Sequence, residues 1–558
     1  MHCPISIVYD NTNDATTCPG RRGQTDQSGH ISGARRIAMR ICIRSVLFRR
    51  LAVAVMLGTA ASLTSPVFAQ KAGGDVIFAQ GSNPPSLDGM VTSSQASRNI
   101  TMHIYESLFG YDENIRPMPI LAESLKVSDD GLTYVIPIRK GVLFHNGKEM
   151  TARDVKASLE RYRKHGATAG LLNPVTSIDI TGDHEITLKF AKATPTFLEA
   201  FASPRAPAVI IPEEEAGKDP GKIEFIGTGP YRFVEYVPDS HVKLAKFAEY
   251  AQDNRFKGPD GFGGKKTAYF NTVTFRIMPE TGARTAALEA GEIQGNEQIP
   301  GPTAKRLQND PRFSVHENKR WGFLTFIMNL KQPPADNPKF REAVQVALKM
   351  EPIVGIATEG LFSLNHGWQY PGTTFDAGDI GKNLYNLGDA ARAKALLAEA
   401  GYKGEPFAIL TDNNIPEHGK SAVVIAEQLK AVGINAIIKQ VDWPTALKIR
   451  LQDTGWNGWT LVMGIEPYMG PVAVVSTLVG PTSHFREPDA KLDALYEELI
   501  TGKSVEERQS TFKKIQARLY ELNAIIKIGD VGLAQATRSN VKGFKTFRFP
   551  RLYDVWLE

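Results

Sequence analysis

The residues that could perform catalysis are few, and they do not form a known catalytic pattern. Gly419-Lys420-Ser421 and Gly502-Lys503-Ser504 resemble the end of a phosphate-binding loop, but the glycine required five residues earlier is Asn414 in one and Glu497 in the other. The chain contains neither a G-x-S-x-G nor an H-E-x-x-H motif. We therefore expect no enzyme and no cofactor or metal, and a secreted hydrolase with a dispersed site remains the alternative.

Cysteine and charge are distributed unevenly. All three cysteines, Cys3, Cys18 and Cys42, lie near the N-terminus. Residues 1–69 also hold eight arginines and three aspartates, so the rest of the chain has 57 of the 65 basic and 57 of the 60 acidic residues. Without cysteine, residues 70–558 cannot form a cysteine-based zinc site or nucleophile. Because they carry no basic excess, no nucleic-acid partner is expected.

The N-terminal segment is typical of a secretory signal. A basic stretch precedes an uncharged, mostly apolar run over 51–69, which ends in Val67-Phe-Ala69. This order predicts export with cleavage after Ala69, and no cysteine stands there to anchor a lipoprotein. A permanent membrane anchor is the alternative, since 19 uncharged residues are nearly long enough to span a bilayer. Residues 1–38 are polar and aperiodic, so we expect the true start at Met39.

Local patterns in the remaining chain predict an α/β protein. Thr151 with Asp154, and Ser504 with Glu507, have the spacing of a helix capping box. A helix ended by Gly433 and followed by a strand forms an α/β unit. The predicted strands cover 75–79, 133–138, 185–190, 434–441 and 524–528, and the predicted helices cover 151–165, 389–400, 421–432 and a segment that begins at 504.

Two glycine-containing segments are interpreted as backbone devices. Asp129-Asp130-Gly131 is expected to form a tight turn, because aspartate starts turns and glycine permits positive φ. Gly227-Thr-Gly229-Pro230 is expected to allow the close approach of a strand.

A series of longer blocks carries a resemblance to a known family. In order and spacing, the blocks resemble the dipeptide/oligopeptide-type (family 5) extracellular solute-binding proteins of bacterial ABC importers, from about residue 75 to 558. The blocks are Ile104-Tyr-Glu-Ser-Leu-Phe109, Val127-Ser-Asp-Asp-Gly-Leu-Thr-Tyr134, Phe144-His-Asn-Gly147, Thr151-Ala-Arg-Asp-Val155, Gly227-Thr-Gly-Pro-Tyr231, Ala287-Leu-Glu-Ala-Gly-Glu-Ile293 and Ala395-Leu-Leu-Ala-Glu-Ala-Gly401.

The resemblance implies a two-lobed α/β clamp, like the type II periplasmic binding proteins, with an inserted subdomain. The expected division is a first lobe at 70–112, 222–317 and 525–558, an inserted subdomain at 113–221, and a second lobe at 318–524. Such a protein is periplasmic and monomeric. It captures a peptide or peptide-like solute between its lobes and delivers it to a permease and ATPase complex. A chemoreceptor or chaperone role for the same clamp is a second alternative.

The resemblance also implies ligand-binding positions. In the first lobe they are Asn296-Glu297-Gln298, and Ser93 is expected near the wall opposite the loop of Asn413 and His418. In the second lobe, Trp443 occupies a position that stacks over the ligand in relatives, and Arg450 matches an arginine that can pair with a ligand carboxylate. Asn413 and His418 lie in a loop that lines the cleft in relatives. For each position, a purely structural or solvent-exposed role is the alternative.

One segment departs from the family pattern. Peptide-binding relatives pair the peptide's ammonium with an aspartate, but in the segment from Trp459 to Glu466 that position holds Met463 or Ile465. Burying an ammonium group without a partner charge would cost several kcal/mol. Either Glu466 replaces the aspartate, or the ligand has no free amino terminus there, and we favour the second interpretation.

Overall fold

The computed structural model describes residues 72–558, apart from 413–414, 467–468, 482 and 547–548. The predicted export segment, its cleavage point and Asn413 therefore lie outside the described residues. Among the helices of the described part, none is long and apolar enough to cross a membrane.

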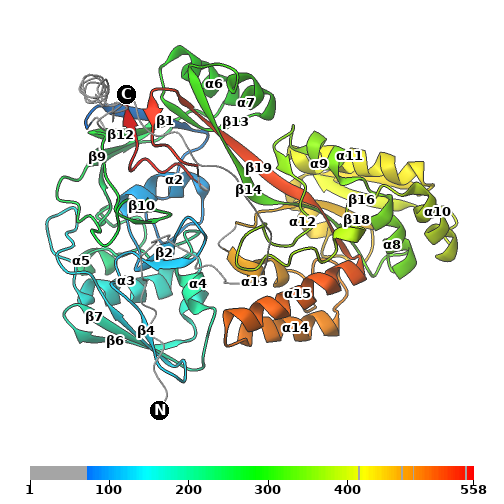
Figure 1. Ribbon diagram of the computed structural model, residues 1–558, viewed down its shortest axis with the longest axis horizontal. Coiled ribbons are helices and arrows are strands. Elements are labelled where there is room, and N and C mark those ends of the chain that lie inside the picture. The colour runs from blue at the N-terminus through cyan, green and yellow to red at the C-terminus, as the bar shows by residue number, and fades with distance from the viewer. Residues whose placement is uncertain (1–71, 413–414, 467–468, 482, 547–548) are drawn as a thin grey trace, which may run out of the picture. The chain divides into compact units, whose positions relative to one another are not determined.

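A mixed eleven-stranded sheet forms the framework (Figure 1), which confirms the predicted α/β class. Strands β16, β17 and β18 run parallel to one another, and β1 is parallel to both of its neighbours. Across the sheet the order is β17 (Ala436–Val441), β16 (Phe407–Asp412), β18 (Gly458–Met463), β14 (Phe313–Met328), β19 (Ile525–Arg538), β13 (Gly295–Ile299), β1 (Asp75–Gln80), β12 (Thr272–Ile277), β9 (His241–Lys246) and β8 (Tyr231–Val237), with β15 (Phe362–Ser363) paired to β19.

The two longest strands of this sheet, β14 and β19, pair along nearly their whole length. At one end Phe313 packs in a core with residues of β1 and β13, and at the other Phe326 belongs to a separate core with residues of β16 and β17. Between these ends the register shifts between Asn318 and Gly322. A bulge locally interrupts a ladder and lets the strand bend. The predicted lobe boundary at 317/318 falls beside this bulge, and the exact division remains a prediction.

A second sheet lies within the predicted insert. Its order is β4 (Lys126–Val127), β5 (Thr133–Pro137), β7 (Glu185–Phe190) and β6 (Val175–Gly182), and α3 (Ala152–His165) packs against it. The Thr151–Asp154 capping box is present at the start of α3. The predicted turn is also present, with Gly131 at φ +70°. Apolar side chains of this sheet join the same core as β1 and β12, so the insert shares its core with the first lobe.

The other helices pack around these sheets (Figure 1). They are α2 (Gln95–Ile104), α4 (Phe197–Phe201), α5 (Glu213–Ala216), α6 (Thr281–Ala290), α7 (Gly301–Leu307), α8 (Pro338–Ala347), α9 (Met350–Ala357), α10 (Ala390–Glu399), α11 (Pro416–Ala431), α12 (Trp443–Ile449), α13 (Gly470–Val475), α14 (Ala490–Thr501) and α15 (Val505–Leu522). Short pairs are β2 (Phe109–Tyr111) with β3 (Pro117–Pro119), β10 (Pro259–Asp260) with β11 (Gly263–Gly264), and β20 (Val541–Lys542) with β21 (Trp556–Leu557).

Most predicted element boundaries agree with the structure; two boundaries and one helix cap differ. Helix α11 starts at Pro416 rather than at 421. The prediction missed its first turn because that turn is polar and shows no apolar periodicity. At the start of α15, Ser504 accepts from the Glu507 N–H, but the Glu507 carboxylate accepts from Lys503, so the capping box is not reciprocal. Strand β19 continues ten residues past the predicted end at 528, to Arg538.

The expected close approach at Gly227 and Gly229 is present, but its partner is a helix end. A Cβ on Gly227 would lie 2.2 Å from the carbonyl oxygen of Ile104, and one on Gly229 would lie 2.4 Å from that of His103. Both carbonyls belong to the last turn of α2. The two glycines therefore fix the C-terminal end of α2 against the segment that leads into β8, and the predicted strand contact was wrong.

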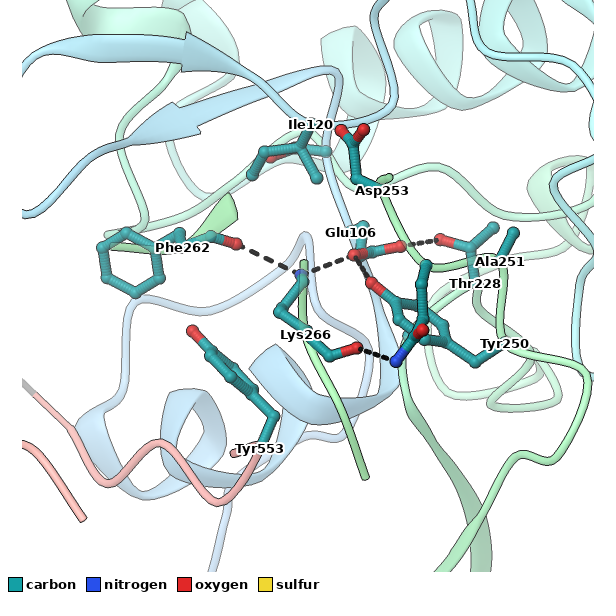
Figure 2. A network of polar contacts seen from close by, with 12 residues as sticks. Glu106, Ile120, Thr228, Tyr250, Ala251, Asp253, Phe262, Lys266 and Tyr553 are labelled. Carbon is teal, nitrogen blue, oxygen red and sulfur yellow. Dashed lines mark hydrogen bonds and ion pairs between the residues drawn. The ribbon is translucent and has the colours of Figure 1, made fainter. Parts of the chain in front are cut away.

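A buried polar network joins several segments of the first lobe (Figure 2). The Glu106 carboxylate lies 2.5 Å from Lys266 Nζ and accepts hydrogen bonds from the hydroxyls of Tyr250 at 2.9 Å and Thr228 at 3.0 Å. Lys266 also donates to the Phe262 carbonyl at 3.1 Å. The side chains of Glu106 and Lys266 are at most 3% exposed. Each charged group thus has an opposite charge and further hydrogen bonds, as a buried ion pair requires.

Candidate ligand-binding site

Trp459, the second residue of β18, is the centre of an aromatic and cationic group in the second lobe. Its ring lies 6.4 Å from the Trp443 ring and 5.7 Å from the His484 imidazole, and the Arg450 guanidinium lies 5.3 Å from its centre. Trp443 is the first residue of α12 and Arg450 directly follows the last, so this one helix places both.

Helix α12 is set locally by its cap. The Asp442 carboxylate accepts a hydrogen bond from the Thr445 N–H at 3.0 Å, and Pro444 follows at the start of the helix, where its missing N–H is not needed. The helix therefore begins directly after β17. This position puts Trp443 beside both Trp459 and the ring of His418, 5.7 Å away.

Several hydrogen-bond donors around Trp459 have no acceptor. Within the described residues, buried side-chain atoms without a hydrogen-bond partner include Trp459 Nε1, Arg450 Nε, Ser483 Oγ, His484 Nδ1 and Arg486 Nε. We call Arg450, Trp459, Ser483, His484 and Arg486 the Trp459 cluster. An unmade hydrogen bond of a buried group costs about 1–3 kcal/mol. The cluster is therefore expected to gain free energy from an acceptor supplied from outside.

The charge of the cluster points the same way. Arg486 pairs with Asp453 at 3.1 Å, whereas no carboxylate of the described part pairs with Arg450. Burial, followed by the positive charge of Arg486, lowers the pKa of Arg450. Burial, followed by the charge of Arg450, lowers the pKa of His484 to about 4. At neutral pH His484 is thus uncharged, and Arg450 is a half-buried cation.

Glu466 is the carboxylate left in the segment that departs from the family pattern, and it already forms an ion pair within the protein. Its oxygens accept from Nη1 and Nη2 of Arg98 on α2, each at 3.2 Å, and both side chains are at most 5% exposed. The Arg98 guanidinium also lies 5.6 Å from the centre of the Phe549 ring. This bidentate pair joins α2 to the segment that follows β18 and neutralises the charge that a ligand ammonium would need.

His418 is fully buried in the first turn of α11. Its Nδ1 donates to the Asp412 carboxylate, and its Nε2 accepts a hydrogen bond from the Val462 N–H at 2.7 Å. Burial lowers the pKa of His418, although Asp412 opposes this effect. Both ring nitrogens are engaged, so the geometry favours a role in fixing β16, α11 and β18 rather than direct ligand contact.

The first-lobe positions lie on β13. Asn296 is buried, and its side-chain oxygen Oδ1 accepts a hydrogen bond from Arg284 Nε at 3.3 Å. The Glu297 carboxylate accepts from the Gly81 N–H and from Asn99 at 2.6 Å, and burial raises its pKa. Gln298 is exposed. The segment is therefore tied to the ends of β1 and α2, with Gln298 left to reach solvent.

The structure brings some of the predicted positions together and leaves others apart. Trp443 and Arg450 each lie close to Trp459, and Met463, at the end of β18, belongs to the same hydrophobic core as Trp459. Ser93 is exposed in the segment before α2.

Sequence reasoning missed Arg98, Ser483, His484 and Arg486. The last three fall in the short segment Ser483-His-Phe-Arg486, which has one apolar residue, no periodicity and the composition of an ordinary loop. The sequence did offer one signal: Ser483, His484 and Arg486 are hydrogen-bond donors within four residues, and no acidic residue lies among them.

Among the described residues, no group of three or more His, Cys, Asp and Glu side chains is arranged to hold a metal ion.

Comparisons with known proteins agree with this architecture. The family model for bacterial extracellular solute-binding proteins, family 5, matches residues 116–484. The glutathione-binding protein GsiB of Pectobacterium atrosepticum is 27% identical over 520 residues, which cover 87% of this chain and 94% of that protein. GsiB of Salmonella choleraesuis is 31% identical over 393 residues, 69% of this chain and 73% of that protein.

Among solved structures, the ABC transporter substrate-binding protein CtaP of Listeria monocytogenes superposes with a TM-score of 0.75 at 23% identity, covering 87% of this chain and all of that one. The chain therefore belongs to the family 5 extracellular solute-binding proteins. Its fold is that of the type II periplasmic binding proteins, as the resemblance implied.

Proposed function

We propose that this protein is the periplasmic substrate-binding subunit of an ABC importer and that it captures a peptide or peptide-like solute between its lobes. The observation that carries the proposal is the Trp459 cluster, in which buried donors lack acceptors on the scaffold of a solute-binding family. The relatives are named for glutathione, a tripeptide whose carboxylates and amides offer the acceptors that such donors need.

In this proposal the ligand works by selecting the closed clamp. A ligand that contacts both lobes only when they are closed shifts the population toward that state. The bulge between Asn318 and Gly322 provides a place for β14 to bend. The closed form then docks on the permease, and the ATPase drives release of the solute into it.

Trp443, Arg450 and Trp459 are proposed to form the second-lobe wall of the ligand site. Glu297, Gln298 and neighbouring residues form the opposite wall, with Asn296 and Ser93 beside them. His418 and Glu466 are proposed to position this wall, because their polar atoms are engaged by Asp412, Val462 and Arg98. Asn413 and Met463 remain predicted contacts.

We also propose that binding occurs without turnover. The Asp412–His418 pair resembles two members of a hydrolytic triad. However, His418 Nε2, the nitrogen that would act as the base, accepts a hydrogen bond from the Val462 N–H. A general base must reach the proton that it removes. Occupation of this nitrogen argues against such a role.

Export is part of the same proposal, with the signal peptide removed after Ala69. Expression of the full chain in a Gram-negative host, followed by N-terminal sequencing of the periplasmic fraction, should give a protein that begins at Gln70. A protein retained in the membrane would instead support the anchor.

The central experiment is a thermal-shift and calorimetric screen of residues 70–558 with di- and tripeptides, including glutathione. A solute present at 100 times its Kd should stabilise the protein by about 2.7 kcal/mol and raise Tm. The same solute should be recovered unchanged after prolonged incubation. Catalytic consumption of the solute, or the absence of a shift with every member of the panel, would contradict the proposed function.

A further inference from the structure

Helix α4 lies beside the start of α15 (Figure 1), and an ion pair joins the two helices. Nη1 and Nη2 of Arg508 on α15 each donate to one carboxylate oxygen of Glu199 on α4, both at 2.7 Å. Two parallel hydrogen bonds are the geometry in which a guanidinium binds a carboxylate most strongly. The partners are 309 residues apart, so the pair is a purely tertiary contact.

The two partners are anchored in different hydrophobic cores. Phe197 and Phe201 of α4 belong to the core that contains residues of β1 and α2. Phe512 and Ile515 of α15 belong to the core that contains Trp459. The ion pair is therefore a contact between two separately packed units, and neither unit needs it to complete its own core.

Each partner is also held from its own side. The Tyr111 hydroxyl, which belongs to the same core as α4, donates to the backbone carbonyl of Glu199 at 2.7 Å. The Phe375 ring, in the same core as α15, lies 5.6 Å from the Arg508 guanidinium. Because these supports do not cross between the cores, both ends keep their orientation when the pair separates. A preorganised contact of this kind loses little entropy each time it forms.

The Glu199–Arg508 pair borders open space. The Glu199 side chain is 27% exposed, and that of Arg508 is 5% exposed. A cavity of about 290 Å³ adjoins the pair, which is ample room for water. Residues of both cores line this cavity, among them Tyr111, Pro117, Glu199, Phe375 and Val505. Water can therefore hydrate the carboxylate when the pair opens.

The Arg98–Glu466 pair also lies where the two cores meet, but its setting differs. Both of its side chains are at most 5% exposed. Ile465, directly before Glu466, belongs to the core of Trp459, whereas Met469 packs against the core of β1 and α2. Glu466 thus lies in a segment that both cores share, and this position suits a permanent connection rather than a contact that opens.

We propose that Glu199 and Arg508 form a latch that favours the closed clamp without touching the solute. This inference rests on the proposed function, since it names a source of closure free energy other than the solute. Bending of β14 at the bulge between Asn318 and Gly322 separates the two cores and breaks the pair. Because the closed fraction is the binding-competent one, the apparent Kd rises by the factor by which that fraction falls.

The test measures closure directly in residues 70–558, which contain no cysteine. Arg153→Cys on α3 and Lys513→Cys on α15 replace exposed residues anchored to the two different cores, and each new thiol carries a spin label. Pulsed electron paramagnetic resonance then gives the distance between the labels in the ligand-free protein.

Four forms are compared in this labelled background: the unchanged latch, Glu199→Gln, Arg508→Lys and Glu498→Gln. Glu498 forms an exposed pair with Lys514 between α14 and α15, which share one core, so Glu498→Gln is the matched control. Circular dichroism and Tm verify folding. Arg508→Lys retains the charge and provides a second variant if Glu199→Gln fails to fold.

We expect a closed and an open distance, with a closed-to-open ratio about fivefold lower in Glu199→Gln, as for loss of a well-formed ion pair near the surface. Arg508→Lys should lower the ratio less, because lysine keeps the charge and loses the fork. Glu498→Gln should match the unchanged latch. Raising NaCl from about 50 mM to about 1 M should lower the ratio with Glu199 present and leave Glu199→Gln nearly unchanged, which a merely structural role would not produce.

The same distances in the unchanged latch and in Glu199→Gln would overturn the proposal, whether the protein is then mostly open or mostly closed. If the ratio responds to Glu199→Gln and no solute of the screen binds, the latch stands and the proposed function fails. If a solute binds and the ratio does not respond, the latch alone fails.

Discussion

Two polar regions of this protein differ in how their hydrogen bonds are completed. In the Glu106–Lys266 network, the charged pair is surrounded by Tyr250 and Thr228, which donate to the same carboxylate. In the Trp459 cluster, Arg450 lies over an aromatic ring and neighbouring donors have no acceptor within the described residues. The first region completes itself within the protein, whereas the second requires a partner.

This difference separates a structural network from a binding site more clearly than residue type does. Both regions contain a cation and aromatic rings, and Lys266 even lies 5.4 Å from the centre of the Tyr553 ring, much as Arg450 lies over Trp459. The two regions differ in whether the described part of the protein supplies a carboxylate to the cation. A buried charge that has its counter-charge is costly to separate from it, and a charge without a partner is costly until a ligand binds.

The largest expected effect is on the complete network. Glu106→Leu leaves Lys266 buried without its counter-charge and should lower the free energy of unfolding by about 3–5 kcal/mol. Urea denaturation followed by circular dichroism measures the change. Glu498→Leu, which removes an exposed partner of Lys514, is the control and should change it by less than about 1 kcal/mol. Equal effects would remove the distinction between the regions.

The Arg98–Glu466 pair, like the Glu106–Lys266 pair, is completed within the protein, so removing one partner should destabilise the fold. Arg98→Met should cost about 3 kcal/mol, since it leaves the Glu466 carboxylate buried and unpaired. The double variant Arg98→Met/Glu466→Met should recover most of this loss, because apolar replacement of a buried pair is often neutral. A double-mutant cycle in urea measures the coupling, and additive losses would contradict the pairing.

The two regions also predict different responses to pH. Burial lowers the pKa of His103, next to the network, and that of His484, in the Trp459 cluster, to about 4 in each case. Because the unfolded pKa is about 6.5, the unfolded state binds more protons below that value. Each histidine should therefore reduce stability as pH falls from 6.5 to 4, by up to about 1.4 kcal/mol per pH unit.

Urea titrations of His103→Gln and His484→Gln between pH 4 and 7 test this sign, and each variant should flatten the profile. A carboxylate ligand should raise the pKa of His484 and so reduce its contribution, while that of His103 stays unchanged. A steeper profile in either variant would mean that the protonated form is favoured in the folded state.

The smallest expected effect is at Arg450 itself. Arg450→Gln removes a half-buried cation that has no counter-charge and lies near Arg486, so the unfolding free energy without ligand should change by less than about 1 kcal/mol. Arg161→Gln is the contrast, because it breaks a buried pair with Asp88 and should cost about 3–5 kcal/mol. Similar losses in urea would place Arg450 among the structural arginines.

Local sequence predicted much of the fold. The caps at Thr151 and Ser504, the turn at Gly131 and the strand over 185–190 are encoded by residues within a few positions of one another. The resemblance pointed to Trp443 and Arg450, and in the structure each lies against Trp459. The start of α11 was missed because its first turn is polar, and a periodicity argument needs apolar residues.

The sequence by itself determined the α/β class, the predicted export signal and most helix and strand positions, because these depend on neighbouring residues. The tertiary structure decided which charged groups are paired. Glu466 and Arg98 are separated by 368 residues, and Arg161 and Asp88 by 73, yet both pairs form, while Arg450 has an aromatic face as its partner among the described residues. Which charged groups pair depends on the strand order of the sheet, because this order brings distant segments together. The spacing of residues within a short segment carries no information about it.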